Sequence, residues 1–102
     1  MSHPMLETVN SKISFLDWVA LQHSQKNGFV GSYKFRVNEG KKYLKIVRGC
    51  SVSSQDSVWC FIDESGNILK PASWSAPTKN FARGTVDDLA NENFITNHIY
   101  GF

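Results

Sequence analysis

The sequence lacks the features that mark membrane, secreted and metal-dependent proteins. It has no run of about 18 apolar residues, and its first residues, Met-Ser-His-Pro-Met, do not form a secretory signal. Only two cysteines are present, Cys50 and Cys60; they form no CxxC pair and have no histidine at metal-ligand spacing. We therefore expect a cytoplasmic protein without membrane contact, disulfide or metal site, whose two thiols are free and partly buried.

Motifs for catalysis and for phosphate binding are missing as well. Neither a GxxxxGK loop nor a GxGxxG turn occurs. His3, His23 and His98 are widely separated and are interpreted as surface or packing residues; an enzyme would require His23 or His98 to meet an Asp or Cys60 in a cleft. Residues 63–67 resemble a calcium loop, but the position of Gly and the missing twelfth-position Glu favour a hairpin turn. The sequence thus predicts a protein that is not an enzyme and has no cofactor.

What is present is the composition of one globular domain. The chain has 102 residues, of which 41% are apolar and 20% charged, and this length suffices to bury a core without disulfides or metal. We expect a single α+β domain over residues 1–102, with a loose arm over residues 1–12 or a short helical turn within its first ten residues. A helical period then runs from Ser14, a suitable N-cap, to Lys26, and Asn27-Gly28 supplies a stop. The predicted apolar face of this helix contains Phe15, Trp18 and Val19.

The hydrophobic period changes to two after the helix, which is typical of strands with one buried face. Turn residues at 38–41 and 63–66 indicate two hairpins, the second with Gly66 at positive φ. The Ser-rich residues 52–55 predict a connecting loop. The helix is expected to pack on one side of an antiparallel meander of about four strands. The predicted strands are residues 33–37, 43–47, 57–62 and 67–70.

After Lys70 the pattern is irregular. Pro71 and Pro77 bracket Trp74 and indicate an ordered loop, because proline neither donates to a strand ladder nor continues a helix. Thr85 is placed to cap a short C-terminal helix over residues 86–90. The apolar tail is expected to dock on the core.

One segment of the chain is strongly basic. Residues 26–48 contain seven Lys or Arg residues and one Glu, a net charge of +6, although the whole chain carries only +2. If Lys34, Arg36 and Lys45 emerge on one sheet face with Tyr43 or Trp59, charge and stacking surface combine as in sites for single-stranded nucleic acid or nucleotides. The alternative is an ordinary solvated sheet face, since lysines also protect edge strands.

A second segment, residues 70–84, places basic residues around aromatic rings. Lys79 and Arg83 lie near Trp74 and Phe81 in the sequence. An exposed Trp beside Arg and Lys can stack on a base and hold a phosphate, or anchor a protein partner. In the alternative interpretation Trp74 covers the core and Arg83 bonds loop carbonyls.

The same region carries a resemblance to a known family. A strand EGKKYLKIV precedes SVWCFID, a turn ESGN and the run ILKPASWSAPTKNFARG. This combination resembles a group of small uncharacterised proteins of tailed bacteriophages, which have an EGxKYxKI strand and a KPASWxAPxKxxARG segment. The resemblance covers residues 38–84 and implies a small accessory role in the cytoplasm of a bacterial host. Ser75 and Thr85 depart from the pattern, which has Lys and Asn there; if that Lys binds an anion, its absence weakens the nucleic-acid interpretation.

Two functional hypotheses follow. The first is a noncatalytic phage accessory protein that binds nucleic acid or a nucleotide through the basic sheet face and the 70–84 segment. The second is a protein-interaction module that inhibits or redirects a host bacterial protein. A homodimer is compatible with the many aromatic residues, although no pattern specifies one. The candidate ligand-binding residues are Lys34, Arg36, Lys45, Trp74, Lys79 and Arg83.

Overall fold

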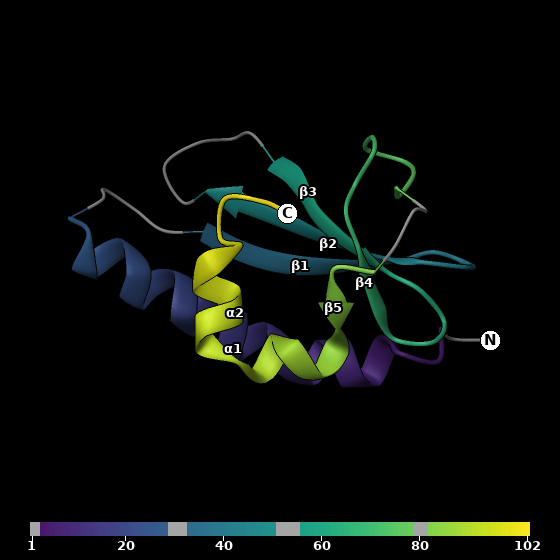
Figure 1. Ribbon diagram of the computed structural model, residues 1–102, viewed down its shortest axis with the longest axis horizontal. Coiled ribbons are helices and arrows are strands. Elements are labelled where there is room, and N and C mark those ends of the chain that lie inside the picture. Colours follow the sequence, from purple (N-terminus) through teal and green to yellow (C-terminus); the bar gives the residue numbers. More distant parts are fainter. Residues whose placement is uncertain (1–2, 29–32, 51–55, 79–81) are drawn as a thin grey trace.

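The computed structural model describes residues 3–28, 33–50, 56–78 and 82–102 (Figure 1). A helix lies along one face of a five-stranded antiparallel sheet of order β1-β2-β3-β4-β5, with short helical segments beside it. The α+β fold is therefore confirmed, with one more strand than the sequence predicted. The predicted loop 52–55 and the side chains of Lys79 and Phe81 lie outside the described residues. The elements are α1 (Leu6–Lys26), β1 (Tyr33–Glu39), β2 (Leu44–Cys50), β3 (Asp56–Ile62), β4 (Asn67–Leu69), β5 (Gly84–Thr85), the 3₁₀ helix η1 (Val86–Ala90) and α2 (Glu92–Asn97).

Helix α1 begins at Leu6, so the prediction of a loose arm was wrong for the described residues 3–12, and the predicted N-cap at Ser14 was wrong as well. The helix extends further because its buried stripe starts early: Val9 is fully buried, in line with Leu16 and Val19. Trp18, expected on the buried face, is 48% exposed. The helix ends at Lys26, as predicted.

His3 fixes the segment before α1 to the β1–β2 hairpin. Its backbone N–H donates to the Glu39 carboxylate over 2.6 Å. Its ring Nδ1 accepts the N–H of Met5 at 3.1 Å, so Nε2 carries the proton and donates to the carbonyl of Lys42 at 3.0 Å. These bonds bury His3 and explain why the segment is not a loose arm.

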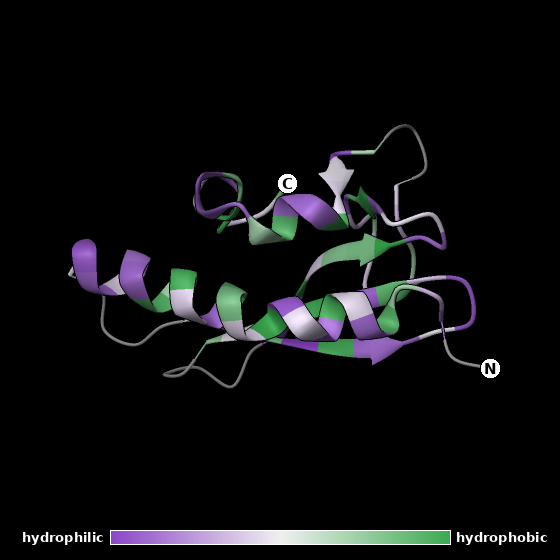
Figure 2. Ribbon diagram, turned by 90° about the horizontal axis from the view of Figure 1, so that it is seen from below, coloured by the Kyte–Doolittle hydropathy of each residue, from purple (hydrophilic) through white to green (hydrophobic). Residues whose placement is uncertain are grey.

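The inner face of the sheet packs against α1 and forms the main core. Phe35, Leu44 and Ile46 point to this side, and Figure 2 shows hydrophobic residues recurring along both layers. Strand β3 contains an extra residue: Ile46 pairs with Cys60 and Val47 with Val58, which leaves Trp59 unpaired in a β-bulge.

The bulge changes which side chains of β3 reach the core. Regular alternation would place Trp59 on the same face as Phe61. With one extra residue, Trp59 and Cys60 both enter the inner core, whereas Phe61 lies on the outer face opposite Lys45. The prediction that Trp59 can emerge beside the basic residues was therefore wrong, and Trp59 is only 1% exposed.

The outer face carries a second, smaller apolar cluster of Val47, Phe61 and Leu69, all buried. The 70–78 loop adjoins it and is ordered, as predicted, because Pro71 bridges to Pro77 and Thr78 N–H donates to the Lys70 carbonyl at 2.7 Å. This loop positions Trp74 at the outer face.

The C-terminal residues close the fold, as predicted. Thr85 N–H donates to the Asp88 carboxylate at 3.0 Å and starts η1. Ile95 and Ile99 are buried in the main core. Arg48 holds the tail by donating from Nη1 to the Ile99 carbonyl at 2.6 Å.

Candidate functional site

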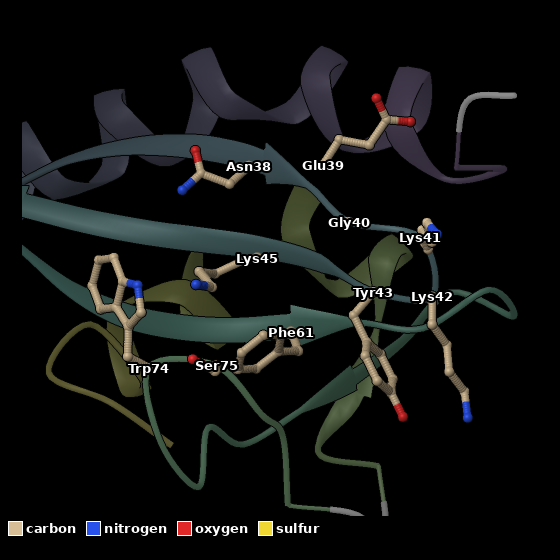
Figure 3. Close-up of a pocket in the computed structure, with 10 residues that line it drawn as sticks. All are labelled: Asn38, Glu39, Gly40, Lys41, Lys42, Tyr43, Lys45, Phe61, Trp74 and Ser75. Atoms are coloured by element: carbon tan, nitrogen blue, oxygen red, sulfur yellow. The ribbon is translucent and has the colours of Figure 1, made fainter.

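A groove lies on the outer face of the sheet, at the end where β1 and β2 join (Figure 3). It has a volume of about 400 Å³, within the range of small-ligand sites. Three sources contribute its walls: the hairpin turn, the facing residues of β2 and β3, and the tip of the 70–78 loop. Its lining residues are Asn38, Glu39, Gly40, Lys41, Lys42, Tyr43, Lys45, Phe61, Trp74 and Ser75.

The hairpin turn places two lysines side by side at the mouth of this groove. Gly40 N–H donates to the Tyr43 carbonyl at 3.0 Å and closes the turn around Lys41 and Lys42. A Cβ on residue 40 would lie 2.8 Å from that carbonyl oxygen, so the turn requires glycine there. Both lysines are exposed.

Aromatic rings form one wall of the groove. In Figure 3 Trp74, Phe61 and Tyr43 follow one another, and the Lys45 side chain extends toward the indole. Lys45 Nζ is 4.5 Å from the centroid of the Trp74 ring and 6.0 Å from that of Phe61, a cation–π arrangement. Phe61 is buried as the floor, but Trp74 is 49% exposed. Trp74 is thus available for stacking and is not a buried plug of the core.

The charge of the groove is predominantly positive. Among the described residues no carboxylate lies within 4.0 Å of the ammonium groups of Lys41, Lys42 or Lys45. Glu39 is the acidic residue of the lining, and its carboxylate already accepts the His3 N–H. An anion entering the groove therefore meets three cationic groups that are not neutralised by a neighbouring carboxylate.

The structure separates the six residues that the sequence suggested for ligand binding. Lys45 and Trp74 meet in the groove. Lys34 and Arg36 share the outer face but lie further along β1, and Arg36 forms an ion pair with Asp56 at 2.8 Å. Arg83 is exposed beside β5, where its backbone N–H donates to the Ile68 carbonyl at 2.7 Å. The side chain of Lys79 is outside the described residues.

The model of a family described as Family of unknown function (DUF7717) matches residues 5–99. The chain belongs to this family. DUF7717 thus includes every residue that lines the groove, but its description names no activity and no source, so the phage resemblance stays a prediction. No curated protein and no solved structure matches the chain.

Three groove residues of this DUF7717 chain were missed at the level of sequence: Lys41, Lys42 and Phe61. Lys41 and Lys42 could have been predicted from the sequence, because a hairpin turn next to Lys45 brings all three basic residues to one end of the sheet. Phe61 was not recoverable, because its position on the outer face depends on the bulge at Trp59.

His3 lies beside the β1–β2 hairpin, whereas His23 and His98 both lie near the C-terminal tail. His23 Nε2 is 3.2 Å from the Tyr100 hydroxyl, and His98 Nδ1 is 2.8 Å from the Phe94 carbonyl. Within residues 3–28, 33–50, 56–78 and 82–102 no group of three His, Cys, Asp or Glu side chains is arranged to hold a metal ion. No helix in the same residues is both long and apolar enough to span a bilayer.

The two thiols are free, as predicted, but differ in environment. Cys60 is completely buried, and this burial raises the pKa of its thiol far above the ordinary value of 9.0. Cys50 is partly exposed. We expect a thiol reagent to modify Cys50 alone in the native protein at pH 8, and both residues in urea, because the reacting species is the thiolate.

The raised pKa also fixes the sign of a pH effect on stability. The Cys60 thiolate forms more readily in the unfolded chain than in the folded protein. The contribution of this thiol to the free energy of unfolding is therefore complete below about pH 9 and declines as the pH rises above that value. Urea denaturation at pH 8 and pH 10 of the native chain and of the Cys60→Ala variant checks this. Equal losses of stability in both proteins would contradict it.

Proposed function

We propose that this protein binds nucleic acid or a nucleotide in the groove on the outer sheet face, as a noncatalytic protein of the cytoplasm. The observation that carries the proposal is the Lys45 ammonium group 4.5 Å from the centroid of a half-exposed Trp74 ring, beside Lys41 and Lys42. The combination supplies a flat stacking surface and cationic groups within one groove.

Single-stranded nucleic acid suits this arrangement better than a duplex. A free base can stack on the exposed indole of Trp74, and Tyr43 offers a second ring at the other end of the aromatic wall. Phosphate groups between successive bases can then approach Lys41, Lys42 and Lys45. In a duplex the bases are stacked on each other and their faces are not accessible.

A direct test is a two-dimensional amide NMR titration of the labelled protein with an eight-nucleotide oligothymidylate, and separately with ATP, at about 50 and 200 mM salt. We expect shifts at the groove residues, notably Lys42, Lys45 and the indole of Trp74, which weaken with salt. A spectrum unchanged by both probes at both salt concentrations would contradict the proposal.

We expect Trp74→Ala to raise the Kd for the oligothymidylate by about fivefold to more than a hundredfold, since stacking contributes about 1–3 kcal/mol per base. In a plot of log K against log salt, the slope is negative. Lys45→Ala should make it less steep by about 0.7, the value for one lost phosphate contact to a single strand. Lys34→Ala is the matched control: it removes a lysine from the same sheet face but not from the groove, and should leave the slope unchanged.

The alternative function, an interaction module that inhibits or redirects a host protein, is favoured by one observation. Trp74 is half exposed, and tryptophan is one of the residue types that are enriched at the energetically dominant positions of protein interfaces. Tagged protein should then retain one stoichiometric partner from bacterial lysate, and Trp74→Ala should lose it. Recovery of background proteins only would count against this function. The accessory role in a phage-infected cell, which the family resemblance suggests, belongs to the same set of proposals.

A further inference from the structure

The side of α1 that is turned away from the sheet has an unusual composition. Seven side chains are exposed between Glu7 and Lys26, and none of them is charged. They are Asn, Ser and Gln residues together with Trp18, 48% exposed, and Leu21, 42% exposed. Phe15 stacks on Trp18 with the ring centroids 5.9 Å apart. We call this side the α1 outer face.

Solvent does not explain this composition. The exposed side of an amphipathic helix normally carries charged residues, whereas the charged residues between Glu7 and Lys26, Lys12 and Asp17, are only partly exposed and the fully exposed positions are uncharged. The centre of a protein interface shows the opposite trend, with few Lys or Glu residues and more aromatic ones. In Figure 2 the helix lies in front of the sheet, where no described element covers it.

The two ends of the α1 outer face carry opposite charges. Glu7 is exposed in the first turn and Lys26 in the last, and neither forms an ion pair with another described residue. They are separated by 19 residues, or about 28 Å along the helix. A surface that is neutral along its length and bears one negative and one positive end is complementary to itself in the antiparallel direction.

We propose that the α1 outer face binds the same face of a second copy of this chain, as an antiparallel pair about a two-fold axis. Glu7 of each copy then faces Lys26 of the other, so two ion pairs form at the ends. A parallel pair would place like charges against each other. A second copy is the favoured occupant because this face, with Glu7 at one end and Lys26 at the other, is complementary to itself in charge.

The same register gives a well-matched centre. If Glu7 faces Lys26, Trp18 of one copy lies opposite Phe15 of the other, because the positions run in opposite directions. Ser11 lies one turn before Phe15 and Ser14 one turn before Trp18, and their small side chains leave room for the indole of the other copy. By the two-fold symmetry the contact between Trp18 of one copy and Phe15 of the other occurs twice.

The size of the face predicts a weak dimer. A helix of 21 residues is about 31 Å long, and one helix face is smaller than the roughly 800 Å² that each partner contributes to a standard interface. We therefore expect a dimer only at high protein concentration and a monomer at low concentration. Since α1 packs on the inner face of the sheet, the dimer leaves the groove on the outer face open, and this inference does not depend on the proposed function.

Sedimentation equilibrium over a wide concentration range tests the proposal. We expect the full chain to shift from monomer to dimer as its concentration rises, and Trp18→Glu to remain monomeric. Trp74→Glu is the matched control for oligomeric state, because Trp74 is equally exposed but lies on the opposite side of the molecule. Thermal unfolding of each variant establishes that it is folded.

A charge exchange tests the antiparallel register. Glu7→Lys and Lys26→Glu should each weaken the dimer several-fold, because each replaces two attractive contacts by two repulsive ones. The double variant Glu7→Lys/Lys26→Glu should restore the dissociation constant toward that of the original chain. A monomer at every concentration, a dimer that persists in Trp18→Glu, or a double variant no better than the single ones would overturn the proposal.

Discussion

Replacement of Trp59 by alanine is expected to lower the free energy of unfolding by about 3–5 kcal/mol, the range for removing a large aromatic side chain from a core. Trp59 is 1% exposed, and its ring lies 5.0 Å from the centroids of both Phe35 and Phe102. Its indole N–H also donates to the His98 carbonyl at 2.7 Å. The residue therefore joins β1, β3 and the C-terminal tail, and alanine would leave a cavity among all three.

Urea denaturation followed by circular dichroism measures this loss. Trp59→Phe keeps an aromatic ring but removes the donor to His98, so it should cost less, about 1–3 kcal/mol. Trp74→Ala is the matched tryptophan control and should cost only about 1 kcal/mol, because that side chain is half exposed and its contact with Lys45 is solvated. Equal denaturation midpoints for Trp59→Ala and Trp74→Ala would contradict the assignment of Trp59 to the core.

The elements that the sequence predicted correctly are those in which a local pattern decides the structure. The alternation of Tyr33, Phe35 and Val37 with basic residues needs only the period of a strand, and β1 has this burial pattern. The turn at 63–66 needs a residue at positive φ, and Gly66 has φ of +86°. In both cases neighbouring residues supply the whole signal.

The predictions were wrong where contacts between residues far apart in the sequence determine the local structure. The start of α1 depends on bonds from His3 to Glu39 and Lys42, which are far apart in the sequence. Strand β5 has only two residues and exists because it pairs with β4. The bulge that directs Trp59 inward is likewise fixed by the pairing of β3 with β2 rather than by any residue of β3 alone.

The candidate site was predicted in part for a related reason. The sequence showed that residues 26–48 are strongly basic. In the structure these basic side chains are spread along β1 and β2, two strands of seven residues each, rather than gathered at one place. Lys34 lies about 14 Å along β1 from Asn38, the residue that pairs with Lys45. The hairpin end combines Lys41, Lys42 and Lys45 with the half-exposed ring of Trp74, which joins it from a loop 29 positions after Lys45.

Replacement of Phe61 by alanine should affect both stability and the groove. Phe61 is 3% exposed and contacts Tyr43 with ring centroids 6.1 Å apart, so its loss should cost about 3 kcal/mol. Lys45 and Trp74 are then left without the floor of the groove. We expect the indole N–H resonance of Trp74 to move toward its value in the unfolded chain while that of Trp59 remains in place.

Phe61→Leu separates the two effects, because leucine fills most of the same volume without an aromatic face. Its stability should lie within about 1.5 kcal/mol of the original chain, with the Trp74 indole resonance close to its native position. If the groove acts through Trp74 and the lysines, Phe61→Leu should bind the oligothymidylate almost normally and Phe61→Ala should bind it weakly while still folded. Normal binding by folded Phe61→Ala would contradict a role for Phe61 as the floor that supports Lys45, whose ammonium group lies between the Phe61 and Trp74 rings.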